Sequence, residues 1–297
     1  MKRRDFLKTG AALAVAAPTA ALAADAPAAK SKVVVVRNGE PEALFRKGVD
    51  ALGGITAFVK PGQKVVVKPN IGWDRAPEFA ANTHPGLVGE IVRQCVAAGA
   101  ARVEVFDHTC SAWSRCYRNS GIAAAVEAAG GKMAEAHDKD DYREVACPKA
   151  VNMKTALIHR AILEADVFIN VPILKNHGGA KMTACLKNFM GLVWDRQYMH
   201  RHNLTQCIAD AALYRKPDLN VLDAYRVMQT NGPQGVGLSD VRTLRYQILS
   251  TDIVAADTLA TKLLRFPLET VPHIHRAALL GLGTDEEARM EIVRLEA

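Results

Sequence analysis

The six cysteines of this 297-residue chain include no Cys-x-x-Cys pair. Without that spacing the chain lacks the usual ligand arrangement of a ferredoxin-type iron–sulfur cluster or a zinc ribbon, and no iron–sulfur cluster is expected. Six cysteines in a chain this long do not make a disulfide scaffold, although Cys110 and Cys116 are the nearest pair for a disulfide in an oxidising compartment. Most of these thiols are expected to be small buried hydrophobic groups.

The chain also lacks a basic run interleaved with aromatic residues. Its formal net charge falls from +7 to +4 once residues 1–23 are removed, and so mild an excess without a clustered patch argues against a nucleic-acid partner. The Ala-rich run before Ala23 is interrupted by Pro18 and is shorter than the roughly 20 apolar residues that span a bilayer, so no stable membrane anchor is expected. The loop at 232–237 lacks the Lys-Ser/Thr of a P-loop.

Residues 1–23 have the features of an export signal. The pattern Arg-Arg-x-Phe-Leu-Lys at 3–8 resembles a twin-arginine signal, and Ala21-Leu22-Ala23 fits a signal-peptidase site. We therefore predict export by the twin-arginine translocase to the periplasm, with a signal at 1–23 and a linker at 24–31; an ordinary secretory signal is the alternative. Because the twin-arginine route carries folded proteins, often with a cofactor already inserted, it favours a bound prosthetic group.

Residues 32–297 are predicted to form a single α/β domain. Apolar, β-branched runs predict strands at 33–36, 64–67, 103–106, 167–171, 219–222 and 246–249. Helices are predicted at 42–52, 85–98, 121–129, 154–164, 204–214 and 253–264, and after Pro267. Strands without polar alternation suit burial on both faces. The alternation of strand and helix therefore predicts three layers, a mostly parallel sheet with helices on both faces.

Polar residues follow most of the predicted strands, where an open α/β sheet binds its ligands. The examples include Lys68 and Asn70 after the second strand and His108 after the third. Because they stand at equivalent places, we expect one shared crevice. Its predicted substrate-binding residues are Lys68, Asn70, Asn188, Asp223, Gly232 and Gly235.

The densest polar segment lies between Asn170 and His202. Lys175, His177 and Lys187 cluster there, and residues 183–190 are a candidate helix; lysines and an imidazole near a helix N-terminus suit a carboxylate or phosphate. A lysine near other cations or in a dry pocket can also act as a base or nucleophile. The alternative for each lysine is a solvated surface group, which is the favoured interpretation of Lys181.

Two His-x-His pairs and two aspartates complete the candidates. His200 and His202 can ligate one metal ion from an extended segment but not from one helix face, and a polar loop is the alternative. For His273 and His275 a helix start is favoured over a metal site. Asp252 is expected to cap the helix at 253–264, whereas Asp257 lies inside that helix and has no such explanation.

A series of short motifs runs in order from about residue 32 to the end. They are Val-Lys-Pro-Asn at 67–70, Thr-His-Pro at 83–85, Gly-Ala-Ala-Arg-Val at 99–103, Asn-Val-Pro-Ile-Leu-Lys-Asn-His at 170–177, Leu-Lys-Asn-Phe-Met-Gly-Leu at 186–192, Asp-Leu-Asn-Val-Leu-Asp at 218–223, Gly-Pro-Gln-Gly at 232–235 and the pair Asp252 and Asp257. Together they resemble the domain-of-unknown-function 362 family. The resemblance implies a single α/β domain and names a fold rather than a reaction.

The segment His177-x9-Lys187, followed by His200 or His202, is also similar to the lactate racemase family. That resemblance implies that Lys187 anchors a nickel-pincer nucleotide and that His200 or His202 ligates the nickel. It further implies that His177 and His108 form the acid/base pair, a role that suits imidazoles because their pKa lies near neutral pH.

These observations predict a periplasmic enzyme that acts on a small, carboxylate-bearing anion, with a bound metal ion or metal-containing cofactor. The classes considered are a metal-dependent isomerase and an oxidoreductase. The predicted catalytic residues are His177, Lys175, Lys187 and His108, and the predicted metal ligands are His200 and His202. The alternative is a non-catalytic periplasmic protein that binds an anion or a metal.

Overall fold

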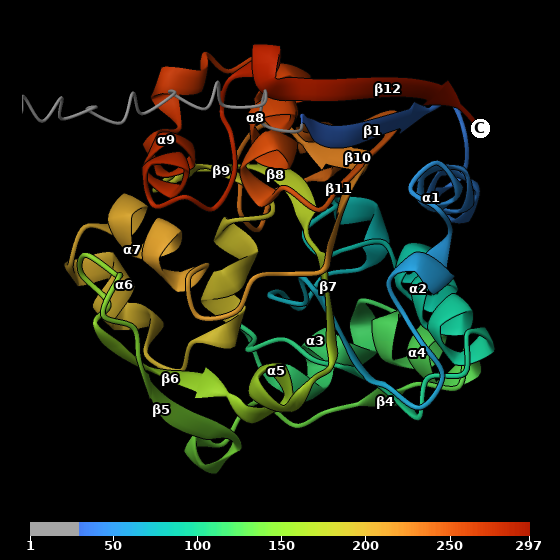
Figure 1. The fold of residues 1–297 in the computed structure, drawn as a ribbon, viewed down its shortest axis with the longest axis horizontal. Coiled ribbons are helices and arrows are strands. Elements are labelled where there is room, and N and C mark those ends of the chain that lie inside the picture. Colours follow the sequence, from blue (N-terminus) through green and yellow to red (C-terminus); the bar gives the residue numbers. More distant parts are fainter. Residues whose placement is uncertain (1–29) are drawn as a thin grey trace, which may run out of the picture.

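The computed structural model describes residues 30–297. The predicted signal at 1–23 and most of the predicted linker at 24–31 lie outside the described residues. Ser31, which the prediction placed in the linker, is the first residue of strand β1. The fold is the predicted α/β arrangement, a mostly parallel sheet with helices on both sides (Figure 1).

The main sheet contains ten of the strands. Its hydrogen-bonded order is β12-β1-β11-β10-β7-β2-β3-β4, and β8 pairs with β10 and with β9. The pairs around β7, β2, β3 and β4 are parallel, whereas β11 runs antiparallel to both β1 and β10. The strand bounds are β1 Ser31–Arg37, β2 Lys64–Pro69, β3 Arg102–Val105, β4 Lys132–Met133, β7 Val167–Val171, β8 Ile173–His177, β9 Lys181–Thr183, β10 Leu219–Met228, β11 Val241–Ser250 and β12 Met290–Glu296.

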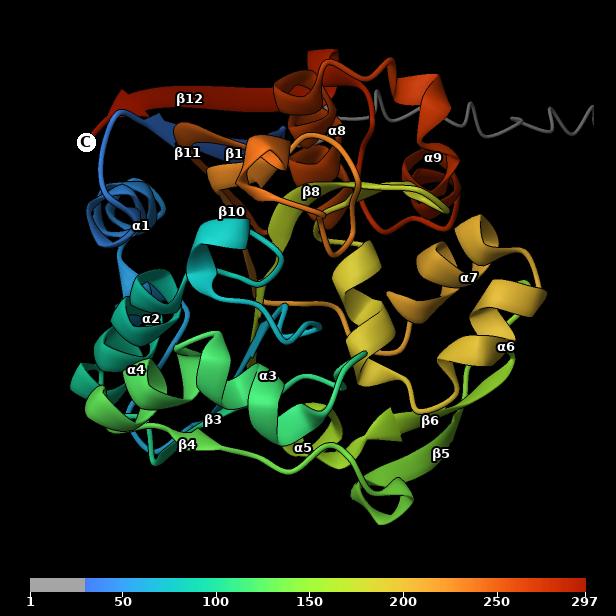
Figure 2. The same ribbon diagram turned by 180° about the vertical axis from the view of Figure 1, so that it is seen from behind.

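Helices cover both faces of this sheet, as Figures 1 and 2 show from opposite sides. Helices α1, α2 and α4 share one hydrophobic core with one set of alternating strand residues, for example Val65 and Val67. Helices α7, α8 and α9 share a second core with the intervening residues, for example Val66. The helix bounds are α1 Pro41–Asp50, α2 Pro85–Ala97, α3 Trp113–Asn119, α4 Ile122–Ala128, α5 Arg160–Glu164, α6 Arg196–Arg201, α7 Leu204–Ala211, α8 Ile253–Leu264 and α9 Pro272–Leu279.

The helices begin where local chemistry satisfies their free N–H groups. In α8 the Asp252 carboxylate accepts from the Val254 and Ala255 N–H groups at 2.9 Å, which confirms the predicted cap. In α2 the His84 ring accepts from the Gly86 N–H at 3.2 Å, and Pro85 occupies the first helical position. None of the helices within residues 30–297 is long and apolar enough to cross a bilayer.

Three parts of the secondary-structure prediction were wrong. The predicted helix at 154–164 is strand β6, Thr155–His159, followed by the short α5; β6 pairs with β5, Tyr142–Ala146, in a separate hairpin. The candidate helix at 183–190 is the end of β9 and a 3₁₀ turn, Lys187–Leu192. The helical prediction after Pro267 holds for α9, but the chain ends in strand β12, which joins the edge of the sheet beside β1.

A row of buried polar residues crosses the sheet on the α7–α8 side. Lys68, Asn170, Asn220 and Ser250 are in lateral register on β2, β7, β10 and β11, and each side chain is at most 1% exposed. We call these four residues the polar row. The Asn170 amide donates to Asn220 Oδ1 at 2.9 Å, and the Asn220 amide donates to the Ser250 carbonyl at 3.2 Å. Along this row, hydrogen-bonded polar groups occupy buried positions that would otherwise hold apolar core side chains.

The turn at 184–188 is fastened across this row. Asn188 donates to Asn170 Oδ1 at 2.8 Å and to the Lys68 carbonyl at 2.9 Å, while Asn170 donates to the Cys185 carbonyl. From the other side, Asp257 accepts from the Cys185 and Leu186 N–H groups at 2.7 and 3.0 Å. The buried carboxylate inside α8 therefore holds the turn that carries Lys187. Burial, partly offset by those N–H groups, raises the pKa of Asp257 to about 7.

We predict that Asn170→Ala lowers the free energy of unfolding by about 2–4 kcal/mol, because it leaves buried partners on Asn188 and Asn220 without hydrogen bonds. Urea denaturation followed by circular dichroism measures the change. The matched control is Asn119→Ala at an exposed amide, where we expect a change within about 0.5 kcal/mol. Equal stabilities of the two variants would contradict the role given to the polar row.

Candidate functional site

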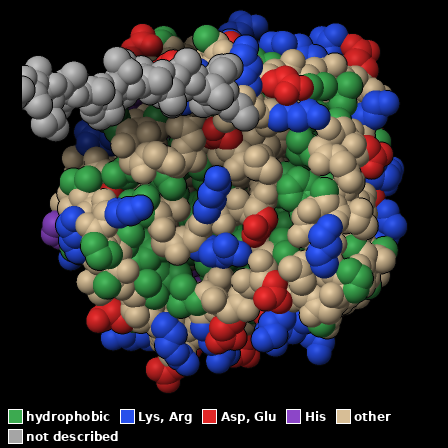
Figure 3. Space-filling view, viewed as in Figure 1, with side chains coloured by type: hydrophobic (Ala, Val, Ile, Leu, Met, Phe, Trp, Pro, Cys, Tyr) green, Lys and Arg blue, Asp and Glu red, His purple; other side chains and the backbone are tan. Residues whose placement is uncertain are grey.

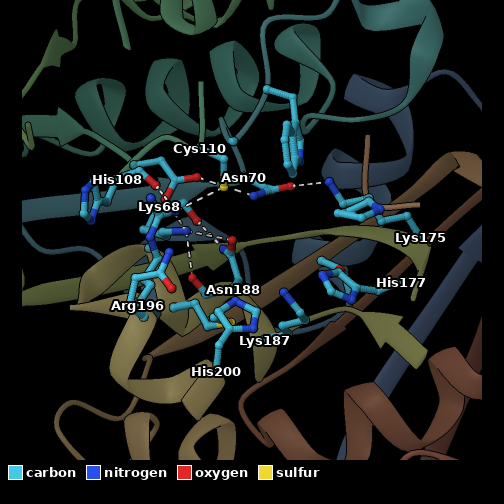
Figure 4. Close-up of a pocket in the computed structure, with 18 residues that line it drawn as sticks. Lys68, Asn70, His108, Cys110, Lys175, His177, Lys187, Asn188, Arg196 and His200 are labelled. Atoms are coloured by element: carbon cyan, nitrogen blue, oxygen red, sulfur yellow. Dashed lines mark hydrogen bonds and ion pairs between the residues drawn. The ribbon is translucent and has the colours of Figure 1, made fainter. Parts of the chain in front are cut away.

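A cavity of about 420 Å³ opens above the carboxyl ends of β2 and β3 (Figure 4). Its walls come from the segments after these strands, from β8, from the 184–191 turn and from α6. Eight of the twelve residues predicted for the site line it: Lys68, Asn70, His108, Lys175, His177, Lys187, Asn188 and His200. The expected convergence of the polar segments on one crevice is therefore observed for these residues.

Lys68 is the buried cation at the floor of the cavity. Its ammonium lies 2.8 Å from Asp107 Oδ1 and donates to Asn188 Oδ1 at 2.7 Å and to the Asn188 carbonyl at 2.8 Å. Burial lowers the pKa of Lys68, and the Asp107 carboxylate opposes that shift. Gly191 makes room for the pair, since a Cβ there would lie 1.8 Å from Asp107 Oδ1 and 2.6 Å from Lys68 Nζ.

Lys175 stands on β8, which crosses over the sheet to pair with β10. Its ammonium, at 1% exposure, donates to Asn70 Oδ1 at 2.8 Å and to the Ala81 carbonyl, and no carboxylate pairs with it among residues 30–297. Burial, reinforced by the nearby Lys187 charge, lowers the pKa of Lys175 to about 7. A buried amine with only neutral partners leaves a positive charge that an anionic ligand can pair with.

Lys187 is the first residue of the 3₁₀ turn and is partly exposed to the cavity. Its ammonium has no hydrogen bond to another described residue, in contrast to Lys68 and Lys175. Loss of hydration and the charges of Arg196 and Lys68 lower the pKa of Lys187 to about 8, although Cys110 and Asp107 oppose the shift. About a tenth of the Lys187 amine is therefore neutral at pH 7, and about half of it at pH 8.

The ring of His177 is fixed in one tautomer. Its Nδ1 accepts from the Gly179 and Ala180 N–H groups, both at 3.1 Å, so the proton of the neutral ring resides on Nε2. Burial and the neighbouring Lys187 charge lower the pKa of His177 to about 3. The side chain is therefore a neutral hydrogen-bond donor at physiological pH, and the acid/base role predicted for it stays a prediction.

His108 and His200 have a free ring nitrogen in different settings. The Nδ1 of His108 lies 3.1 Å from the Val193 carbonyl and donates to it, so Nε2 has the lone pair. The ring stacks on Trp194 at a centroid distance of 5.1 Å. Burial and the charge of Arg196 lower the pKa of His108, and burial and Lys187 lower that of His200, which lies at the rim. Both imidazoles are thereby kept neutral near pH 7.

Ten of the eighteen residues that line the cavity were not among the predicted site residues; Arg196, Thr183 and Cys110 are three of them. Arg196 donates to the His108 and Thr109 carbonyls at 2.9 and 2.6 Å, and its Nη1 lies 3.2 Å from the Cys110 thiol. Thr183 has a buried hydroxyl without a hydrogen-bond partner in the described part of the chain. Arg196 lies within the polar segment at 170–202, so its place in the sequence could have identified it as a site residue. That the side chains of Cys110 and Thr183 face the cavity depends on the fold and could not be predicted from the sequence. Cys110 and Cys116 are separate free thiols.

Four predicted residues do not line the cavity. His202 follows the last residue of α6, where its ring stacks on Tyr198 at a centroid distance of 4.0 Å, whereas His200 lines the cavity. Asp223 lies in the middle of β10, which extends beyond the predicted strand, and accepts from the His84 N–H at 2.8 Å beneath α2.

Gly232 and Gly235 serve the loop rather than the cavity wall. A Cβ at Gly232 would lie 1.8 Å from the Asn176 carbonyl oxygen, and Gly235 has φ = +75°, in the left-handed region that favours glycine. Asp240 holds this loop by accepting from the Val236 and Gly237 N–H groups at 2.7 and 3.0 Å. Only Pro233 of the predicted 232–235 loop reaches the cavity.

Other candidates from the sequence have structural positions. Lys181 is exposed, as the favoured interpretation held. His275 is on the surface, 2.7 Å from Asp285. His273 is fully buried in α9 with no partner for either ring nitrogen among residues 30–297, and burial lowers its pKa to about 3. On the face shown in Figure 3, basic and acidic side chains are interspersed rather than gathered by sign.

Comparisons with known proteins identify relatives of this chain. A family model described as a domain of unknown function, number 362, matches residues 65–262, which is more than half of the chain. A thylakoid-associated protein of Synechocystis is 26% identical over 257 residues, covering 81% of this chain and 75% of that protein.

Two solved structures have a related arrangement at 11% identity. The lactate racemase apoprotein of Thermoanaerobacterium thermosaccharolyticum aligns with a TM-score of 0.46 over 72% of this chain and 53% of its own. A Thermotoga maritima protein from a structural genomics programme aligns with a TM-score of 0.44 over 76% and 60%. The chain thus spans between about half and three fifths of these two structures.

We predict that Gly191→Ala lowers the free energy of unfolding by about 1–3 kcal/mol, because the added methyl group overlaps the Lys68–Asp107 pair. Urea denaturation measures the effect. Gly178→Ala is the matched control, since its Cβ would meet no atom within 4 Å, and we expect it to change stability by less than about 0.5 kcal/mol. A Gly191→Ala protein as stable as the control would show that the pair can move aside.

Proposed function

The chain belongs to the domain-of-unknown-function 362 family, and we propose that its cavity is the active site of an enzyme acting on a small, carboxylate-bearing molecule. The observation that carries this proposal is the charge of the wall. Lys68, Lys175, Lys187 and Arg196 line the cavity against one carboxylate, that of Asp107. Asp107 is already paired with Lys68, so the remaining cations have no carboxylate opposite them within the described wall.

The residues divide into binding groups and reactive groups. Lys175, with Thr183 beside it on the neighbouring strand β9, supplies donors that suit a carboxylate. The neutral Nε2–H of His177 suits the carbonyl or hydroxyl oxygen of a substrate, because it donates without adding charge. Lys187 supplies a base, and an amine with a pKa near 8 is well matched to proton transfer near neutral pH.

A metal held by protein side chains alone does not fit this site. Among residues 30–297 no group of three or more His, Cys, Asp or Glu side chains is placed to hold a metal ion, and His202 points away from His200. The amines and imidazoles of the wall are the groups that the proposed chemistry uses. The predicted metal-containing cofactor stays a prediction, and metal analysis with intact-mass measurement of the purified protein tests it.

We predict that malonate binds to the purified protein and that Lys175→Met and Lys187→Met each weaken it by about tenfold or more, since each removes a desolvated cation. Affinity should be highest below pH 7 and fall as pH rises through about 7 to 8, because Lys175 and Lys187 lose their protons there. Isothermal titration calorimetry in buffers of different ionisation enthalpy should detect proton uptake on binding at pH 8.

The controls are malonamide, which has the same skeleton without charge, and Lys216→Met at an exposed lysine outside the wall. Equal binding of malonamide and malonate would refute the anion site. Incubation of small carboxylates with the protein in D₂O separates the two functions considered: deuterium exchange at the carbon next to the carboxylate supports an enzyme, whereas binding without turnover of any carboxylate supports the binding protein.

Export by the twin-arginine translocase to the periplasm is part of the proposal. It rests on the Arg-Arg-x-Phe-Leu-Lys pattern at 3–8. We predict that replacing Arg3 and Arg4 together by lysine retains the full-length chain in the cytoplasm, whereas the native chain is found in the periplasm starting at Ala24. Cell fractionation with intact-mass measurement checks both. Export of the Arg3→Lys, Arg4→Lys variant at the native level would favour an ordinary secretory signal.

A further inference from the structure

The three lysines of the cavity differ in what their amines contact. Lys68 is bound by Asp107 and Asn188, and Lys175 is bound by Asn70 and the Ala81 carbonyl. These bonds hold both ammonium groups in the wall; they occupy all three protons of Lys68 and two of the three protons of Lys175. Lys187 has no such bond within residues 30–297, and its side chain extends into the same space (Figure 4). It is therefore the amine with the freedom to approach a bound molecule.

The neighbours of Lys187 act together to disfavour its charged form. Lys68 from β2, Lys175 from β8 and Arg196 from α6 are cations that face the same cavity. The imidazoles of His177, His200 and His273 add no compensating negative charge. A lysine that is desolvated and surrounded by cations is activated as a nucleophile, because a larger fraction of its amine is neutral near pH 7 than in a solvated lysine.

Among residues 30–297, Cys110 and Asp107 are the groups that raise the pKa of Lys187. The Asp107 carboxylate is already paired with Lys68, and the Cys110 thiol lies 3.2 Å from the Arg196 guanidinium. Neither group forms a hydrogen bond to Lys187. A neutral amine consequently persists in a wall whose other cations attract an anion, and this combination selects a substrate with both a carboxylate and an electrophilic centre.

We propose that Lys187 forms a Schiff base with the carbonyl carbon of a small molecule that also bears a carboxylate, such as a 2-oxo acid. This inference rests on the proposed function and names the substrate class of the same site. The carboxylate is held by Lys175 with Thr183, whose buried hydroxyl has no partner in the described chain. The carbonyl oxygen accepts from Nε2 of His177; Figure 4 shows Lys187 between His177 and His200.

The step balances without an oxidant or a reductant. The neutral Lys187 amine attacks the carbonyl carbon, a C–N bond forms, and the π electrons of the carbonyl move to its oxygen. The proton that the new ammonium nitrogen loses passes to this oxygen and makes it a hydroxyl group. The hydroxyl group takes a second proton, from solvent or from the Lys175 ammonium, the C–O bond breaks, and water leaves. The product is a protonated imine, which attracts electrons from a bond on the adjacent carbon and so supports proton transfer there.

The test uses pyruvate as the probe and sodium cyanoborohydride to reduce the imine to a stable secondary amine. The full-length protein should gain the mass of one pyruvate less one oxygen atom, and peptide mapping should place it on Lys187. At pH 7 we expect Lys187 to be labelled at least about tenfold faster than exposed Lys216, because burial and the neighbouring cations lower the pKa of Lys187 to about 8. The labelling rate at Lys187 should rise about tenfold between pH 6 and 7 and level off above about pH 8, where its amine is already largely neutral.

Lys187→Arg keeps the positive charge but cannot form the imine, so it should abolish the label, whereas Lys216→Arg should leave it unchanged. Circular dichroism and urea denaturation verify that Lys187→Arg is folded, and excess malonate should suppress the label in the native protein. Labelling at the same rate on Lys216, or on another lysine in preference to Lys187, would overturn the proposal. Malonate binding without any labelled Lys187 would refute the Schiff base and leave the anion site standing, whereas absence of both would refute the proposed function as well.

Discussion

The hydrogen bonds of Asn188 hold the site together, because they connect the polar row to the turn that carries Lys187. One amide reaches the Lys68 ammonium, the Lys68 carbonyl and the Asn170 side chain. Asp257 fixes the preceding two residues of the same turn from α8. A segment without a regular helix is thereby positioned over the ends of β2 and β7, and each bond is buried where water cannot replace it.

This arrangement gives one residue type three different properties. Lys68 is a charge paired with Asp107, Lys175 is a charge solvated by an amide and a carbonyl, and Lys187 has no fixed partner among the described residues. The differences follow from the partners alone, since all three amines face one cavity. A ligand carboxylate would pair with the Lys175 ammonium, whose partners within the described residues are neutral, and its binding would favour the charged form of Lys175.

Much of the fold could be predicted because the strands are buried on both faces. The apolar runs at 64–67 and 167–171 match β2 and β7, and the acid before Ile253 marked the start of α8. The failures occurred where the periodicity was ambiguous. Residues 154–164 include Ala, Leu and Ile, which suit a helix, yet Thr155–His159 pairs as a strand with Tyr142–Ala146. Because eight residues of loop separate the two strands, the sequence around either strand does not indicate this pairing.

From the sequence, the candidate site could be predicted only for those residues whose position is determined by the carboxyl end of a strand. Lys68, Asn70 and His108 follow parallel neighbours, so the rule for open sheets located them. The same rule misplaced Asp223, because β10 continues to Met228. It could not locate Asn170, which lies inside β7, because the apolar residues on either side of Asn170 do not show which face of the sheet its side chain occupies.

The role of His177 shows the limit of residue type as a guide to chemistry. An imidazole near lysines predicts a proton carrier, and its place in the cavity agrees with that prediction. The N–H groups of Gly179 and Ala180 argue against the role of a proton carrier, because they donate to Nδ1, the nitrogen that would have to take up a proton. With that nitrogen blocked, the proton-accepting capacity of the wall passes to the amine of Lys187 and to Nε2 of His108, and the chemistry of the site depends on which of these a substrate reaches.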